Sequence, residues 1–198
     1  MSVSTSRTNA GQRDTGGRPR GAPGYGLAVS ANDPLRSDLA ASSEFEPARY
    51  ALSAVVYAER DDEILLLQRA EGSAMAGQWF LPGGFVEAGE LPEEGARREL
   101  FEEGGVRIDG DLEIVGCYSM YVYGYDMLQI SYRGRVADGD VTISHEHDGA
   151  RWVKASDMRA LLTDDVIADM AGGNDDVARL LGHIRTDLDR YLARVESA

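Results

Sequence analysis

The chain has 198 residues with 43% hydrophobic content, and 34 acidic residues against 20 lysines and arginines give it a formal net charge of −14. This length suits one domain with its own core and is too short for two ordinary domains, while the negative charge disfavours duplex nucleic acid and anionic membranes as partners. The single cysteine, Cys117, excludes an intramolecular disulfide and favours the cytoplasm, and no apolar run reaches the length of a membrane span.

The first part of the chain differs in composition from the rest. Residues 1–48 are rich in Gly, Ser, Pro and Arg and contain few large apolar side chains. Such a segment cannot bury enough apolar surface to offset the conformational entropy lost on ordering. We therefore expect a disordered tail over residues 1–48, followed by one domain over residues 49–198.

Two apolar segments open the expected domain. Residues 50–58 (YALSAVVYA) and 64–69 (ILLLQR) are rich in β-forming residues, and a turn at residues 61–62 joins them, which predicts a hairpin. A loop of small residues, 72–77, follows. Residues 79–84 then return as an extended segment that ends in Pro-Gly-Gly.

A helix is predicted from Pro92 to Glu103. Proline is tolerated at the first helical position, and the acids at residues 93–94 complement the helix dipole. The glycines at residues 104–105 supply a stop signal. The helix should therefore have about three turns.

Three glutamates of this helix share one face. At 100° per residue, Glu99, Glu102 and Glu103 lie in one sector, where each pair repels by about 0.2–0.5 kcal/mol. We expect the neighbouring Arg97 and Arg98 to project from other sectors. A hard divalent cation, Mg²⁺ or Mn²⁺, is then the better candidate for neutralising the three carboxylates, and a solvated acidic face is the alternative.

The second half of the chain predicts further strands. Residues 113–123 and 127–136 are rich in β-forming residues on either side of a turn at 124–126, which indicates a second hairpin. Residues 151–153 (RWV) form a short strand. The strands and helices together predict a mixed β-sheet between helices.

Two helices are expected near the end of the chain. Ser156 or Asp157 can cap a helix that ends at Leu162. Residues 175–195 place apolar side chains at helical spacing along one face. This face either covers the domain's own core, which we favour, or forms the interface of a homodimer.

The segment from Gly84 to Val106 carries a family resemblance. It matches every fixed position of the pattern G-x5-E-x7-R-E-U-x-E-E-x-G-U, where U is aliphatic, and this pattern is the Nudix box. The chain therefore resembles the Nudix hydrolases, which implies an α/β fold of the Nudix α/β/α sandwich type. The matching positions are Gly84, Glu90, Arg98-Glu99-Leu100, Glu102-Glu103 and Gly105-Val106.

The resemblance implies a metal-dependent hydrolase. In such enzymes water attacks a phosphorus of a nucleoside diphosphate linked to another group, and Mg²⁺ assists, with Mn²⁺ as a substitute. By resemblance Glu99 and Glu103 are metal ligands, and the backbone carbonyl of Gly84 completes the site. Glu102 contributes through a second metal or a bound water.

The resemblance also implies candidates for the general base and an ion pair that supports the site. The general base is a box glutamate or a glutamate in a later loop, so Glu99 and Glu146 are both candidates. Glu90 and Arg98 form an ion pair that fixes the loop on the helix and supports the metal ligands.

Residues outside the box leave alternatives open. Arg69 can bind a phosphate or pair with one of the many acids. Trp79 is a core aromatic or a platform on which a base stacks, and core is favoured. His145 and His147 lack a nearby thiolate and are expected to line a polar loop, so we assign no zinc.

The substrate is less well defined by sequence. ADP-ribose pyrophosphatases of this family often have a proline some distance after the box, and no proline follows Pro92, which disfavours that class. Many dinucleoside polyphosphate hydrolases have a tyrosine at a similar distance, where this chain has Tyr123. Several other tyrosines lie nearby, so this match carries no information. A nucleoside triphosphate or another small nucleotide is the leading expectation. The alternatives are a pyrophosphatase of ADP-ribose, nucleotide sugars or dinucleoside polyphosphates, and a Nudix-fold module that senses a nucleotide without cleaving it.

Overall fold

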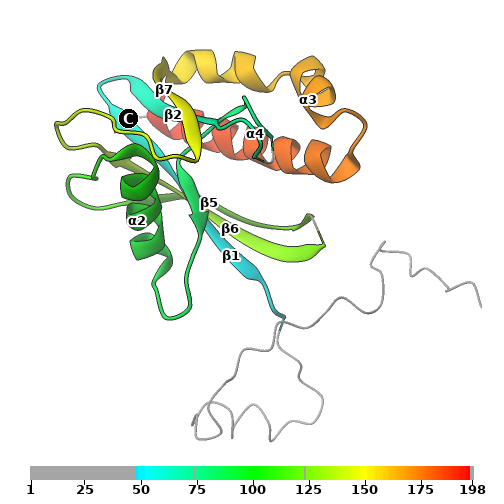
Figure 1. Cartoon of the computed structure of the whole chain (residues 1–198), viewed down its shortest axis with the longest axis horizontal. Helices are drawn as coiled ribbons and strands as arrows, with labels where there is room; N and C mark the ends of the chain where they lie inside the picture. Colours follow the sequence, from blue (N-terminus) through cyan, green and yellow to red (C-terminus); the bar gives the residue numbers. More distant parts are fainter. Residues whose placement is uncertain (1–47, 74, 123, 197–198) are drawn as a thin grey trace, which may run out of the picture. The chain divides into compact units, whose positions relative to one another are not determined.

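The computed structural model describes residues 48–73, 75–122 and 124–196 (Figure 1). All the elements reported below belong to the compact unit Ala48–Ala198. The tail expected over residues 1–48 lies outside the described residues, apart from Ala48.

The strands of the described residues form one mixed sheet. Its main path runs in the order β3-β2-β1-β6-β5, with β4 paired to β1 and β7 paired to β2. Only β1 and β6 are parallel, and the other pairs are antiparallel. The strands are β1 (Ala51–Arg60), β2 (Glu63–Arg69), β3 (Trp79–Phe80), β4 (Gly83–Phe85), β5 (Glu113–Val122), β6 (Tyr125–Arg135) and β7 (His147–Lys154).

Strand β1 is shared between two neighbours on one side. Its first half pairs with β4, with Ala54 opposite Gly84, whereas its last two residues, Glu59 and Arg60, pair with β2. Along its other side β1 runs in register with β6, from Ala51 opposite Met127 onwards. The Pro-Gly-Gly segment is thereby held against the centre of the sheet.

Helices cover both faces of the sheet. The α2 helix (Pro92–Gly104) lies on one side, and the α4 helix (Asp175–Val195) lies on the other (Figure 1). The 3-10 helix η1 (Ala155–Leu162) and the short α3 helix (Asp164–Ala171) pack on the α4 side. The predicted α/β/α sandwich with a mixed sheet is confirmed.

The alternation of side chains along β1 explains the two cores. Ala54, Val56 and Ala58 point to the α2 side and belong to one buried cluster, which includes Leu100 of α2. Tyr57 points to the α4 side and belongs to a second cluster with residues of α4. The α4 members of this second cluster are Leu188, Tyr191 and Leu192.

The predicted hairpins and the helix at 92–103 are confirmed with small shifts of their ends. The helix expected after residue 156 was wrong in type and start, because it is a 3-10 helix that begins at Ala155 without a side-chain cap. The α3 helix was not predicted. Its first turn is capped by the Thr163 hydroxyl, which accepts the Val166 N–H.

No helix in the described ranges is both long enough and apolar enough to span a bilayer.

Candidate functional site

The α2 helix is fixed at both ends by local interactions. Pro92 occupies its first turn, and the Glu94 carboxylate accepts the Leu91 N–H at 2.9 Å. At the other end Gly105 adopts a φ of 70° and donates its N–H to the Phe101 carbonyl, as the glycine stop signal predicted. The helix therefore presents its side chains from a defined register.

Arg98 ties the preceding loop to α2. Its Nε lies 3.0 Å from Oε1 of Glu90, and its Nη2 donates to the Phe85 carbonyl at 3.0 Å. The hydrogen bonds that Glu90 accepts from Arg98 and from the Glu87 N–H hold its pKa below the ordinary value. The ion pair expected between Glu90 and Arg98 is present.

The expected direction of Arg98 was wrong. Its Nη1 lies 2.9 Å from the carboxylates of both Glu99 and Glu102, because the long side chain folds back along the helix surface. Arg97 does project elsewhere and pairs with Glu93 at 2.9 Å. One guanidinium therefore already neutralises part of the charge that the three glutamates share.

Glu99 lies against the Pro-Gly-Gly turn. A Cβ placed on Gly84 would be 2.7 Å from the Glu99 carboxylate, so a side chain at this position would displace that carboxylate. Burial raises the pKa of Glu99, Arg98 opposes this shift, and the negative charges of Glu102 and Glu146 add to it. The structure thus brings the Gly84 backbone and Glu99 together.

Glu103 reaches the same turn from the next position on the helix face. It is only 6% exposed, and its carboxylate accepts the Gly83 N–H at 2.8 Å. Burial raises its pKa to about 7, and the charge of Glu99 contributes in the same direction. Two carboxyl groups therefore converge on residues 83–84.

His147 is the buried neighbour of Glu103. Its Nε2 lies 3.6 Å from Oε1 of Glu103, and burial together with Arg69 lowers its pKa below the ordinary value. A neutral imidazole thus packs against the carboxylate, whereas His145 is not buried. Across the described ranges, no three His, Cys, Asp or Glu side chains are arranged to hold a metal ion.

Glu146 and Arg69 face each other at the edge of this site. Arg69 ends β2, and its Nη1 lies 4.0 Å from Oε2 of Glu146, whose side chain is 54% exposed. The backbone carbonyl of Glu146 accepts the Ala70 N–H at 2.9 Å, which fastens the loop to the end of β2. A solvent-accessible carboxylate and a guanidinium therefore lie close to the buried glutamates.

A pocket of about 260 Å³ extends from these charged residues to the space beneath α4. Arg69, Glu103 and His147 line one part of it, and Tyr118 and Gln129 line another. Trp79 is not among its lining residues. It packs in the second core cluster, where the Arg151 guanidinium lies 4.1 Å from its ring centroid. The remaining lining residues are Ser53, Val55, Tyr57, Met75, Phe80, Leu81, Gly83, Met127, Leu180, Ile184 and Asp187.

The sequence analysis did not single out the polar residues beneath α4. Gln129 and Asp187 are both buried, and the Tyr57 hydroxyl donates to Asp187 at 3.2 Å. The sequence did contain a signal for Gln129: it is a polar residue at an inward-facing position of a strand, and the residues on either side of it are apolar. Asp187 likewise interrupts the apolar face of a helix.

Comparisons with known proteins show similarity to one family. The family model of the NUDIX domain matches residues 47–171, more than half of the chain. The MutT-like protein of Streptomyces ambofaciens is 31% identical over 103 residues, or 52% of this chain and 62% of that protein, less than two thirds of its length. The nucleoside triphosphatase NudI of Klebsiella pneumoniae is 34% identical over 106 residues, or 48% of this chain and 75% of the relative.

A solved structure shows the same architecture. The crystal structure of the MutT protein from Methanosarcina mazei Go1 superposes with a TM-score of 0.51 at 29% identity. The superposition covers 72% of this chain and 94% of that one.

Proposed function

The chain belongs to the NUDIX family, and on this premise we propose that it is a Mg²⁺-dependent pyrophosphohydrolase of a small nucleotide, with a nucleoside triphosphate as substrate. The observation that carries this proposal is the convergence of Glu99 and Glu103 on residues 83–84 beside a pocket. The printed name of the NudI relative, a nucleoside triphosphatase, supports the substrate. The cytoplasm, where such nucleotides are abundant, is the proposed compartment.

The chemistry of the donor set fits Mg²⁺. Glu99, Glu103 and the Gly84 carbonyl would hold the ion, with Glu102 beside them, and all four offer the oxygen atoms that a hard cation prefers. Burial raises the pKa of both Glu99 and Glu103, and the charge of Glu99 adds to the rise at Glu103, which supports this reading because a bound cation would favour the ionised carboxylates. When bound, Mg²⁺ neutralises phosphate oxygens and makes a bound water more acidic.

The surrounding residues have distinct tasks in this proposal. Arg98 keeps the loop on α2 through Glu90. Arg69 supplies positive charge at the site and can bind a phosphate oxygen. Glu146 accepts the proton of the attacking water, since its carboxylate is exposed and its nearest cation lies 4.0 Å away, whereas Glu99 is hydrogen-bonded to Arg98.

A release assay tests the function directly. Purified protein with Mg²⁺ is incubated with nucleoside triphosphates, nucleotide sugars, ADP-ribose and dinucleoside polyphosphates, and the products are separated by chromatography. We expect cleavage of nucleoside triphosphates. Preferred cleavage of another class would replace the proposed substrate.

The variant Glu103→Gln provides the matching test of the site. Loss of one anionic oxygen should lower the metal-dependent rate to background while the shape of the side chain and the fold are retained. Glu93→Gln makes the same change on the same helix away from the site and should keep the activity. Full activity in Glu103→Gln would contradict the metal site.

A sensor without catalysis is the remaining alternative. Tight binding of one nucleotide to wild-type protein, without cleavage of any compound in the panel, would favour it over the hydrolase.

A further inference from the structure

Gln129 is an unusual residue in the pocket beneath α4. It lies on β6, is 7% exposed, and its Nε2 lies 2.5 Å from the Tyr118 hydroxyl. Its amide oxygen accepts no hydrogen bond from the part of the chain that the structure describes. Because Gln129 lines the pocket, this oxygen can accept a hydrogen bond from a ligand that enters it.

The Gln129 carboxamide leaves one polar atom free in either of its two orientations. If the amide is rotated by 180°, its oxygen accepts from the Tyr118 hydroxyl and its NH₂ group is left without a partner. In either orientation one polar atom of Gln129 bonds to Tyr118 and the other is available to a ligand. The pocket therefore offers one hydrogen-bonding position that the protein itself leaves unused.

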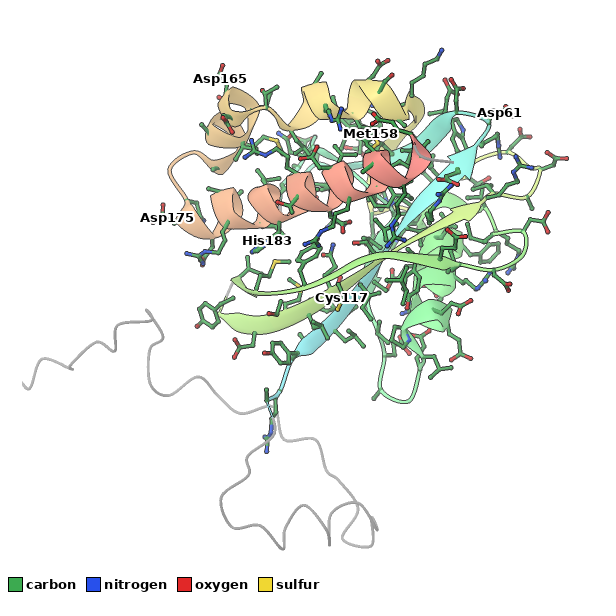
Figure 2. The ribbon with its side chains drawn as sticks, turned by 180° about the vertical axis from the view of Figure 1, so that it is seen from behind. Asp61, Cys117, Met158, Asp165, Asp175 and His183 are labelled. Carbon is green, nitrogen blue, oxygen red and sulfur yellow. The ribbon has the colours of Figure 1, made fainter. Side chains whose placement is uncertain are left out.

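The neighbours of Gln129 hold this arrangement in place. Tyr118 on β5 stacks with His183 of α4 at a centroid separation of 5.3 Å. Figure 2 shows α4 lying across the strands, with His183 labelled on the helix and Cys117 on β5. The hydrogen bond from Tyr57 to Asp187 joins the sheet to α4 a turn further along. The polar end of the pocket is thus preorganised.

The rest of the pocket defines the kind of ligand. Val55, Met127, Leu180 and Ile184 provide apolar contacts, which suit the faces of a flat ring. The edge of a nucleobase carries hydrogen-bond donors and acceptors that a glutamine carboxamide can pair with. A sugar would leave more hydroxyl groups against these apolar residues without partners. The charged end of the pocket, near Glu103, remains for the phosphates.

We propose that the pocket beneath α4 binds the base of the nucleotide, and that Gln129 is the residue that discriminates among bases. This inference rests on the proposed function for the placement of the phosphates. Leu180, Ile184 and Asp187 of the pocket wall come from α4, which begins at Asp175, beyond the matched NUDIX domain that ends at residue 171. The base preference of this chain would therefore depend partly on a helix outside the shared domain.

The variant Gln129→Met tests the assignment, because methionine has a similar length and shape without hydrogen-bonding groups. The ratio of kcat/KM between the best and the worst of ATP, GTP, CTP and UTP should fall by about 10- to 100-fold. The loss should appear in KM for the preferred base, with kcat within about threefold of wild type. Gln68→Met is the matched control, since Gln68 lies on β2, donates to the Gly77 carbonyl and does not line the pocket, and the ratio should be retained in this variant.

Other results would overturn the assignment. An unchanged ratio in Gln129→Met would do so, and so would an equal loss for all four nucleotides, which would indicate a structural role alone. If wild-type protein cleaves none of the four, the proposed function fails, and calorimetric titration with the four nucleoside monophosphates decides this inference separately. Base-dependent binding that Gln129→Met abolishes would support it, whereas no binding, or binding that the variant leaves unaltered, would contradict it.

Discussion

The carboxylates of Glu99 and Glu146 differ in their hydrogen bonding, and this difference predicts which one acts as the base. Glu99 is hydrogen-bonded to Arg98 at 2.9 Å, whereas the cation nearest to Glu146 among the described residues, Arg69, is 4.0 Å away. Glu146→Gln should therefore slow kcat by about 10²- to 10⁴-fold without changing the melting temperature. Steady-state kinetics with saturating Mg²⁺ measure the effect, and Glu71→Gln, a change in an exposed loop, serves as the control. A near-normal rate would assign the base to Glu99.

Asp187 makes the stability of the fold depend on pH. Burial raises its pKa above the ordinary value of an aspartate, while the hydrogen bond from Tyr57 and the charges of Arg190 and Arg194 oppose the shift. At a pH between the pKa of Asp187 in the unfolded chain and its higher pKa in the folded protein, the folded protein retains a proton that the unfolded chain has lost. The contribution of Asp187 to stability is therefore present below the unfolded pKa and decreases as pH rises toward the folded pKa.

A comparison with Asp187→Asn isolates this effect, because asparagine does not titrate and its carbonyl can still accept from Tyr57. The unfolding free energy of wild type minus that of the variant should decrease between about pH 4 and about pH 8. Urea unfolding at both pH values measures the difference. A constant or increasing difference would show that Asp187 is ionised in the fold without a penalty.

The spacing of residues along the sequence predicted where the site glutamates lie, but it did not predict which side chains they contact. The positions of Glu99, Glu102 and Glu103 on one helix face follow from helical geometry alone. The direction of Arg98 did not follow, because a side chain with several rotatable bonds selects its path from the charges around it. Gln129 was missed for a related reason: its role depends on a pocket that forms between elements far apart in the sequence.

Among the elements, strong local signals gave the accurate predictions. The α2 helix has a proline start, an acidic first turn and a glycine stop, and its observed end differs from the prediction by one residue. The α3 helix has only eight residues, too few for a clear apolar period. The Thr163 cap before it and the glycines at 172–173 after it were the available signals.

The apolar face of α4 predicts the oligomeric state. Val177, Leu181, Leu188, Tyr191 and Leu192 are buried within the fold itself, so they are not available to a second copy. We therefore expect a monomer in solution, the outcome that the sequence analysis favoured over a homodimer. Light scattering coupled to size-exclusion chromatography at two protein concentrations measures the mass. A mass of two chains at both concentrations would show that another surface forms an interface.

At the scale of the whole molecule, the two hairpins and a mixed sheet between helices could be predicted, because the strands and helices carry their own periodic patterns and the box indicated the family. The pairing of β4 with β1 and of β7 with β2 could not be predicted, since pairing between strands distant in sequence depends on packing. This pairing decides the site, because β4 brings residues 83–84 to the glutamates and β7 brings His147 to Glu103.

The net charge of the molecule also affects how it meets its proposed substrate. Residues 50–198 contain 14 basic and 29 acidic residues, a formal charge of −15, and Glu99, Glu102, Glu103 and Glu146 add local negative charge around the site. A nucleoside triphosphate remains anionic when it carries Mg²⁺, so protein and substrate repel one another at distances within the Debye length.

Added salt should therefore raise the kcat/KM of this enzyme for its nucleotide substrate. At constant free Mg²⁺, raising KCl from about 20 mM to about 200 mM shortens the Debye length to less than half, and kcat/KM for the nucleoside triphosphate should rise by about two- to fivefold. Choline chloride at the same ionic strength should give the same rise, because screening does not depend on the identity of the cation. A fall in kcat/KM in both salts would instead mean that Arg69 and the bound cation reverse the sign of the field that the substrate meets at the pocket.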